Sequence, residues 1–215
     1  MDEAMLVTDM LTDLSEQAAT KLVKSNKSIN LPSLHSLRPE AARVLASSPN
    51  DLYFPRLASF SEEVAVELAN HRGELALNGL TSLSDTAAGA LSKHEGAVTM
   101  ESLATLSDKP GFLALARKLA DTEGNLYLYG LKQLEVKAAE ALIGHRSLLA
   151  LRDLDDLSPE CAGALARKQG SIGINIRMKM TREVAGILAK HPNIFSWYFL
   201  DHCIQSLGRF EPTVC

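Results

Sequence analysis

The sequence lacks the features that mark several large classes of proteins. Basic residues are not in excess, because 22 lysines and arginines stand against 26 aspartates and glutamates, for a formal net charge of -4. Nucleic acids and anionic membrane surfaces are bound through a basic face, so we expect neither as a partner. No apolar run approaches the roughly 20 residues that a membrane-spanning helix needs.

The first residues of the sequence do not predict a secretory signal. Their sequence, MDEAMLVTDMLTDLSEQ, is acidic where a signal peptide would be basic. We therefore expect a cytoplasmic protein, unless it is exported by a route that leaves no N-terminal signal.

Motifs of catalysis, cofactor binding and metal binding are also missing. The chain has no glycine-rich phosphate loop, no nucleophile elbow and no HExxH pair. Its three cysteines, Cys161, Cys203 and Cys215, have neither the spacing of a metal site nor that of a disulfide framework. We therefore expect a protein that is not an enzyme, with no catalytic residue, no cofactor and no metal.

What the sequence does contain is one unit that recurs from end to end. In residues 75–96, LALNGLTSLSDTAAGALSKHEG, apolar and polar residues first alternate as in a strand, then pass through a turn into a helical pattern. Ser84 can cap this helix, and Gly96 can end it in the left-handed conformation. One such unit is too small to bury its apolar face, so it must stack on copies of itself.

A shift of 23 residues aligns nearly the whole chain. We divide residues 5–193 into eight repeats, which begin at Met5, Ser28, Asp51, Glu74, Ala97, Asn125, Leu148 and Ser171. A ninth strand begins at Ile194, and the aromatic-rich residues 194–215 are expected to cap the end of the array. The N-terminal end has no matching cap, and this open edge could pair with another chain.

Each repeat has two inward-facing apolar strand positions, an apolar turn position and an inward-facing alanine in the helix. The first strand position is occupied by Leu6, Ile29, Leu52, Leu75, Val98, Leu126, Leu149, Ile172 and Phe195. The turn position is leucine until the eighth repeat, which has Arg177. Cys161 stands where other repeats have alanine or valine, so we expect it to be buried.

Helix boundaries recur at the same period. The predicted N-caps are Ser15, Ser61, Ser84, Ser107, Ser158 and Thr181, with proline as the first helical residue at Pro39 and Pro159. The predicted C-terminal stops are Asn50, Gly73, Gly96, Gly124, Gly170 and Asn193.

On these residues the chain resembles the leucine-rich repeat family, in a short bacterial-style form, over about residues 5–200. It departs from that family at Leu80 and its equivalents, where an asparagine commonly bonds the turn backbone. The asparagine ladder is therefore missing, and the turns must satisfy their backbone groups in another way. The resemblance implies a parallel sheet on the concave side, helices on the convex side and, usually, a protein-binding role.

We therefore predict an α/β solenoid: a curved right-handed array of about eight strand–helix repeats that forms one domain over residues 1–215. Strands stack about 4.8 Å apart whereas packed helices need about 8–10 Å, so the stacked units must fan into an arc. All-helical repeats are the main alternative. A 23-residue unit is short for two helices, however, and its alternating leucines suit a strand better.

Candidate binding residues lie on the strands. The residue between the two apolar positions, and the one after them, face the concave side, and all four tyrosines of the chain occupy such positions. Tyrosine favours strands in any case, but it also supplies stiff, amphipathic contact area at interfaces. The predicted partner-binding surface consists of Tyr53, Asn78, Glu101, Tyr127, Tyr129, Arg152, Asn175 and Tyr198.

Two functional hypotheses follow. The first is a non-catalytic scaffold that binds a protein or peptide through this concave surface, and that is a monomer rather than a homodimer. The second is a structural, self-assembling repeat protein that pairs through its uncapped N-terminal edge.

A recurring histidine position has a structural interpretation. His71, His94, His145 and His191 share one repeat position, where other repeats place Ser25, Ser48, Thr122 and Lys168. The side chains of all of these residues can donate a hydrogen bond to the last carbonyls of a helix, so we predict that they cap helices and do not bind metal.

The fifth repeat contains additional residues, Asp108–Phe112, which we expect to form a tolerated surface loop or, alternatively, a projecting contact loop.

Overall fold

The computed structural model describes residues 10–174 and 180–196. In these ranges short strands alternate with helices, and every paired strand runs parallel to its neighbour. The chain is thus an α/β protein of recurring strand–helix units, as predicted. The strand expected near Leu6, the turn residue Arg177 and residues 197–215 of the expected cap lie outside the described residues.

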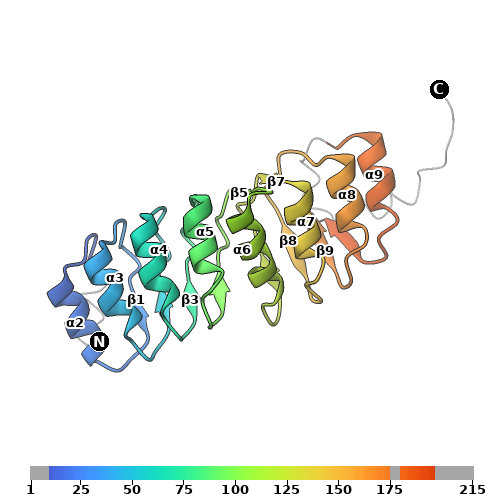
Figure 1. Cartoon of the computed structure of the whole chain (residues 1–215). Coiled ribbons are helices and arrows are strands. Elements are labelled where there is room, and N and C mark those ends of the chain that lie inside the picture. The colour runs from blue at the N-terminus through green and yellow to red at the C-terminus, as the bar shows by residue number, and fades with distance from the viewer. Residues whose placement is uncertain (1–9, 175–179, 197–215) are drawn as a thin grey trace, which may run out of the picture.

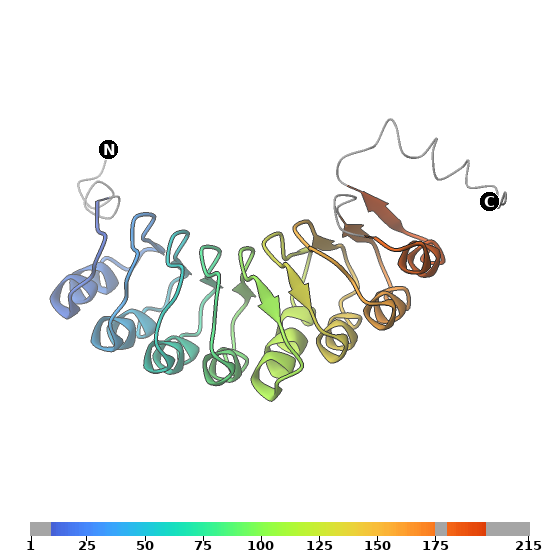
Figure 2. The same cartoon turned by 90° about the horizontal axis from the view of Figure 1, so that it is seen from above.

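The helices lie side by side along the outer side of an arc, while the strands and the turns after them lie on its inner side (Figures 1 and 2). Each helix packs against the next one in the chain. The described residues contain eight helices: α2 (Glu16–Lys24), α3 (Pro39–Ala46), α4 (Glu62–Ala69), α5 (Asp85–Leu91), α6 (Pro110–Ala120), α7 (Val136–Leu142), α8 (Pro159–Leu165) and α9 (Arg182–Leu188).

The strands are two or three residues long. They are β1 (Ile29–Asn30), β2 (Leu52–Tyr53), β3 (Leu75–Ala76), β4 (Val98–Thr99), β5 (Thr105–Leu106), β6 (Leu126–Tyr127), β7 (Gln133–Leu134), β8 (Leu149–Leu151), β9 (Ile172–Ile174) and β10 (Ile194–Ser196). β1 to β4 form one sheet in chain order, and β6, β8, β9 and β10 form a second.

The 23-residue period sets the register of most strands. Leu52 pairs with Leu75, and Leu149 pairs with Ile172, as the repeat alignment predicts. β10 is the exception, because Ile194 pairs with Ile172 and Phe195 pairs with Gly173. A shift of one residue turns every side chain of a strand to the opposite face. The prediction that Phe195 faces inward is therefore wrong, and 42% of this residue is exposed.

The strands do not form one unbroken sheet. β4 and β6 are not paired with each other, and β5 and β7 instead pair in a separate two-stranded sheet. Beyond the ends of β4 and β6, the Gly130 N–H still donates to the Glu101 carbonyl at 2.7 Å. The inner sheet is thus divided at the fifth repeat, where the prediction placed a continuous ladder.

The additional residues of the fifth repeat belong to a helix and to its approach. α6 begins at Pro110, so Gly111 and Phe112 form its first turn, and Phe112 is buried. The expected surface or contact loop is therefore wrong. Asp108 is also built into the stack, since its Oδ1 accepts the N–H groups of Lys137 and Ala138 at the start of α7.

Most predicted helix starts are confirmed. The side chains of Ser15, Ser61, Ser84, Ser158 and Thr181 each accept a backbone N–H in the first turn of the helix that follows. Ser107 is not an N-cap, because α6 begins three residues later, with Lys109 in the cap position. Asp85 of the preceding unit takes over the capping of α6, and its Oδ1 accepts the N–H groups of Gly111 and Phe112.

The predicted helix stops work by two different mechanisms. Gly124 and Gly170 have φ values of +80° and +81°, the left-handed conformation that favours glycine. Gly73 and Gly96 do not have positive φ, so that part of the prediction is wrong. Gly96 is needed for close approach instead, because a Cβ atom there would collide with the carbonyl oxygen of Gly73.

Backbone hydrogen bonds take the place of the missing asparagine ladder in the turns. Leu80 is fully buried, and its N–H donates to the Leu77 carbonyl at 3.0 Å. The Thr81 N–H then donates to Ala58 of the preceding unit at 2.9 Å, and the Ala104 N–H donates to Thr81 at 3.0 Å. The turns are therefore joined to each other along the array.

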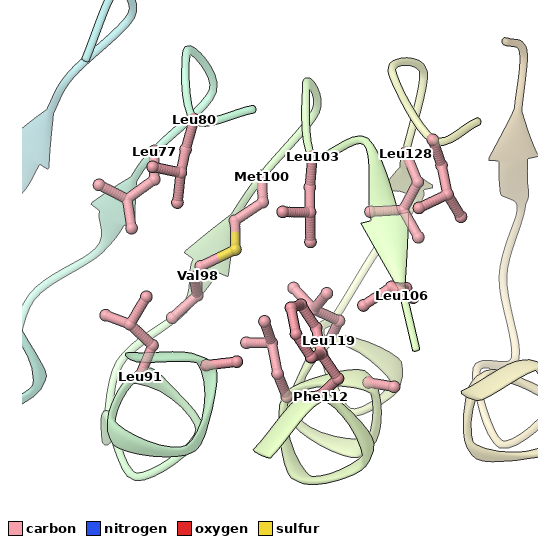
Figure 3. Close-up of a cluster of buried hydrophobic side chains, with 14 of the residues drawn as sticks. Leu77, Leu80, Leu91, Val98, Met100, Leu103, Leu106, Phe112, Leu119 and Leu128 are labelled. Atoms are coloured by element: carbon pink, nitrogen blue, oxygen red, sulfur yellow. The ribbon is translucent and has the colours of Figure 1, made fainter. Parts of the chain in front are cut away.

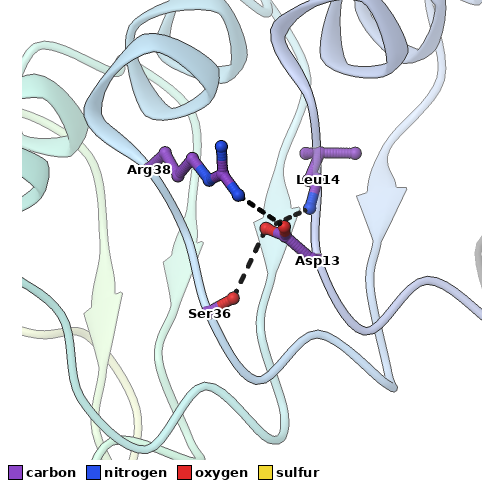
Figure 4. A network of polar contacts seen from close by, with 4 residues as sticks. All are labelled: Asp13, Leu14, Ser36 and Arg38. Carbon is purple, nitrogen blue, oxygen red and sulfur yellow. Dashed lines mark hydrogen bonds and ion pairs between the residues drawn. The ribbon is translucent and has the colours of Figure 1, made fainter.

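Side chains also link neighbouring units near the N-terminus (Figure 4). Asp13 accepts the N–H of Leu14 at 2.9 Å and the hydroxyl of Ser36 at 3.4 Å, and it pairs with Arg38 at 3.1 Å. Both members of the ion pair are largely exposed, so we expect it to contribute less than about 1 kcal/mol.

The inward positions of the repeats form the core. The second strand position is at most 5% exposed in all seven described units: Leu31, Phe54, Leu77, Met100, Leu128, Leu151 and Ile174. Cys161 is buried, as predicted. The buried side chains form one connected cluster from Leu14 to Leu188, which continues across the division of the sheet through Met100, Phe112 and Leu128 (Figure 3).

Candidate partner-binding face

Six residues of the predicted binding surface are described by the structure, and we call them the strand face: Tyr53, Asn78, Glu101, Tyr127, Tyr129 and Arg152. Tyr53 lies in β2 and Tyr127 in β6, and the others follow the strands of their units. The buried residues on either side of Tyr53, Leu52 and Phe54, point toward the helices, so Tyr53 points away from them. Asn175 and Tyr198 lie outside the described residues.

The structure brings three residues of the predicted surface together, namely Tyr127, Tyr129 and Arg152. The two tyrosine rings have centroids 5.1 Å apart and are tilted by 35°. The guanidinium of Arg152 lies over the Tyr129 ring, with Cζ 4.7 Å from the ring centroid, and its Nε also pairs with Asp153 at 3.2 Å. The Asn125 amide donates to the Tyr127 hydroxyl at 2.9 Å. These contacts fix the two rings and the guanidinium against each other as an aromatic surface that also carries the Arg152–Asp153 ion pair.

A second group of the strand face lies on the other side of the division in the sheet. The Tyr53 hydroxyl donates to Asp51 at 3.4 Å, and the Asn78 amide donates to Glu101 at 3.3 Å. Tyr53, Asn78 and Glu101 belong to units of the first sheet, whereas the Tyr127 group belongs to units of the second. The predicted surface therefore spans units of both sheets.

Small residues stand beside the strand tyrosines. Tyr53 pairs in register with Ala76, and Tyr127 pairs with Ala150. Both alanines occupy positions predicted to face the concave side, yet both are buried, at 6% and 0% exposure. The larger tyrosine side chains remain partly exposed beside these buried alanines.

Partial burial and nearby charges shift the pKa values of two tyrosine hydroxyls on this face. Partial burial raises the pKa of Tyr53 above its ordinary value, and the negative charges of Glu74 and Asp51 raise it further. Partial burial also raises the pKa of Tyr129, as do Tyr127 and Glu101, while Arg152 opposes this shift. Both phenols therefore stay protonated at neutral pH and remain able to donate a hydrogen bond.

Two acidic residues that were not predicted from the sequence also lie beside this face. Asp51 and Glu74 occupy the position directly before the strand, and the Asp51 carboxylate accepts the Glu74 N–H at 2.9 Å. A signal for them was present, because this repeat position is acidic only in the third and fourth of the eight repeats. Together with Glu101 they place three carboxylates on three consecutive units.

The histidine column joins neighbouring units. His71, His94, His145 and His191 are 1–3% exposed. His94 bonds to the Gly73 carbonyl at 3.0 Å, His145 to Ala120 at 3.2 Å and His191 to Lys168 at 2.9 Å. Each acceptor belongs to the preceding unit. His145 bonds to the last residue of α6, as the capping prediction requires, whereas His94 and His191 bond to carbonyls beyond the helices of the preceding units. At the end of its own helix, the backbone N–H of His94 donates to the Leu91 carbonyl at 3.1 Å.

No group of three or more histidines, cysteines, aspartates or glutamates gathers at metal-binding distance within residues 10–174 and 180–196. His71 and His94 stack instead, with ring centroids 5.9 Å apart and an interplanar angle of 18°. A pocket of about 430 Å³ opens near His71 between the C-terminal ends of α4 and α5. It is lined from the helices by residues that include Val66, Asn70 and Lys93, so it is separate from the strand face.

Among the described residues, no helix has the length and apolar character to cross a membrane. No protein-family model matches the chain, and no curated protein matches it either. The strand face must therefore be interpreted from its own geometry.

Proposed function

We propose that this chain is a solenoid of the leucine-rich repeat type that binds a protein or peptide through the strand face and performs no chemistry of its own. The observation that carries this proposal is the Tyr127, Tyr129 and Arg152 cluster, where two rings and a guanidinium pack on each other. Aromatic residues and arginine are enriched among the residues that dominate binding energy at protein interfaces.

The arrangement of the core supports a binding role for these side chains. Alternate strand residues already fill the interior, as Leu126 and Leu128 do on either side of Tyr127. The tyrosines are thus not needed to complete the core, and a curved sheet offers an extended surface to a partner.

The overall shape can be tested in solution. A compact globule of 215 residues has a radius of gyration of about 17 Å. We expect small-angle scattering to give a clearly larger value and the profile of a curved rod. A value near that of a compact globule would contradict the solenoid.

The binding role is tested with the double variant Tyr127→Ala and Tyr129→Ala. Because both side chains face away from the core, we expect the melting temperature to fall by less than about 4 °C. We also expect loss of the partner proteins that immobilised wild-type chain retains from a native lysate, since each buried aromatic anchor can contribute about 2 kcal/mol or more.

The control for this experiment is Tyr127→Phe with Tyr129→Phe, which keeps both rings and should retain the partner. If the alanine pair unfolds the protein, the two tyrosines are part of the core and the face is wrongly assigned. If folding and partner capture both survive, the binding surface lies elsewhere.

Self-assembly through the N-terminal edge is the second candidate. Within the described residues, β1 lies at the end of its sheet and pairs on one side only, with β2. An unpaired strand edge can add another strand. Sedimentation at micromolar concentration separates the two candidates, because a monomer contradicts assembly and a dimer favours it.

A further inference from the structure

We propose that the pocket between the C-terminal ends of α4 and α5 binds a small organic carboxylate. The apolar part of this ligand packs on Val66 and Ala90, and its carboxylate accepts hydrogen bonds from Arg72, Lys93 and His71. The volume of about 430 Å³ is in the range of known small-molecule sites. The pocket is lined from the helices, so this ligand binds independently of any partner at the strand face.

The pocket lies where an ion pair between neighbouring helices is replaced by two apolar residues. Arg43 of α3 pairs with Glu67 of α4 at 3.1 Å. A shift of 23 residues places Val66 and Ala90 at the same two positions in α4 and α5. Valine and alanine cannot form an ion pair, and both line the pocket. The pocket therefore has an apolar wall at the place where the preceding pair of helices is bridged by long charged side chains.

A buried histidine without a hydrogen-bond partner lines the same pocket. His71 is 1% exposed, and neither of its ring nitrogens has a partner among the described residues. At the same repeat position, His94, His145 and His191 each bond to a carbonyl of the preceding unit. Backbone carbonyls such as that of Ala46 lie near the His71 ring, but none has the geometry of a hydrogen bond with it. Because an unsatisfied buried polar group costs free energy, His71 is suited to a ligand that supplies the missing partner.

The charges of the lining favour an anion. Arg72 and Lys93 supply two positive charges against one negative charge from Glu95. Helix C-termini favour cations through their free carbonyls, but the Val66 carbonyl here already accepts the Asn70 amide at 3.1 Å. A carboxylate has two oxygens that can accept bonds from a guanidinium, an ammonium and an imidazole N–H. An amine in the same place would offer no acceptor to these donors.

The probe for this site is benzoate, compared with benzylamine, which has a similar shape and the opposite charge. NMR spectra of the full chain with isotope-labelled histidines follow the ring nitrogens, and the His71 signals are identified by their loss in His71→Gln. We expect benzoate to shift the His71 signals saturably, with a dissociation constant of about 1 mM, the strength expected of so small a ligand. The signals of His145 and His191 should not move. No shift at His71, or equal binding of both probes, would overturn the proposal.

The variant Arg72→Gln with Lys93→Gln removes both cations at exposed positions, so the melting temperature should stay that of the wild type. We expect it to bind benzoate about tenfold more weakly or worse. The matched control is Arg146→Gln with Lys190→Gln, at the same two repeat positions beside other histidines of the column. This control changes the net charge equally and should bind benzoate as the wild type does. Equal weakening in both variants would show a non-specific charge effect and contradict the site.

The variant Val66→Asp tests whether the probe enters the pocket itself. A carboxylate on the apolar wall should abolish benzoate binding and strengthen that of benzylamine. Undiminished benzoate binding would place the probe elsewhere and contradict the proposal. Tyr127→Ala with Tyr129→Ala should bind benzoate as the wild type does, so failure of this site and failure of the strand face are separate results.

Discussion

At the scale of single residues, two buried histidines, His71 and His94, are expected to make the fold sensitive to acid. Burial lowers the pKa of His71, although nearby backbone carbonyls and Asp51 oppose that shift. Burial also lowers the pKa of His94, and the positive charges of His71 and Lys118 lower it further, against the opposing Gly73 carbonyl. The two rings are stacked, so protonation of one disfavours protonation of the other.

The sign of the pH dependence follows from linkage. A histidine with a lowered pKa in the folded state is protonated first in the unfolded chain, so its contribution to stability is complete above the unfolded pKa of about 6.5 and is lost as the pH falls below that value. We therefore expect urea unfolding to give a smaller free energy of unfolding at about pH 5.5 than at about pH 7.5.

The variant His71→Gln should reduce this pH dependence, because it removes one of the two shifted groups. The control is His35→Gln, at an exposed position, which should leave the pH dependence as in the wild type. The same slope in His71→Gln and in the wild type would show that His71 does not contribute to acid sensitivity.

At the scale of the secondary structure elements, glycines in helices distinguish close packing from open space. Gly111 is in the first turn of α6, where a Cβ atom would collide with the backbone oxygen of Asp85. Gly163 is inside α8, and a Cβ atom there would meet nothing within 4 Å. We expect Gly111→Ala to destabilise the protein by about 1–3 kcal/mol and Gly163→Ala to stabilise it by about 0.5–1 kcal/mol.

Thermal unfolding of the two variants checks this contrast, since 1 kcal/mol corresponds to about 2–4 °C for a chain of this size. The two substitutions add the same methyl group to a helix, so each serves as the control for the other. A melting temperature for Gly111→Ala at or above that of the wild type would show that α5 and α6 are not packed as closely as the structure places them.

The elements were largely predictable because the same local signals recur in every repeat. The alternation of Leu75 and Leu77 and the cap at Ser84 gave the correct strand and helix in one unit, and the period carried them to the others. The errors lie where the period breaks. His71 precedes the first strand residue of the next unit by four positions, but His191 precedes Ile194 by three, so the strand register moves and Phe195 turns outward.

The interactions between units were less predictable. Pro110 begins α6 later than Ser107 would, and the capping groups of α6 and α7 come from Asp85 and Asp108 of the units before them. Such contacts depend on the distance between stacked units, which a single repeat does not encode. For the same reason the face residues Tyr127 and Tyr129 followed from the repeat position, but the role of Asp51 beside Tyr53 did not.

At the scale of the whole molecule, the division between β4 and β6 raises the question of how far the array unfolds as one unit. The strand pairing stops there, but α5 and α6 pack on each other and Asp85 of α5 caps α6. The core cluster also continues through Met100 and Leu128. In a linear array, stability depends on each unit and on its contacts with the next one.

We therefore predict that the chain unfolds in one cooperative transition, and that a defect beside the division affects both sides. Leu128 is fully buried, so Leu128→Asp places an unpaired charge in the core, at a cost of several kcal/mol. Hydrogen exchange should show a similar loss of protection in β1 to β4 and in β6 to β9. Val66→Asp, at a residue of α4 that is 52% exposed, is the control and should change stability by less than about 0.5 kcal/mol.

The alternative outcome has an equally definite signature. If Leu128→Asp removes protection from β6 to β9 while the amides of β1 to β4 keep their wild-type exchange rates, the fifth repeat separates two independent folding units. The contacts of α5 with α6 would then be weaker than the contacts within each half. Wild-type stability in Leu128→Asp would instead place Leu128 outside the core and contradict the repeat register itself, because the sixth to eighth repeats were all aligned from this position, 28 residues after Met100.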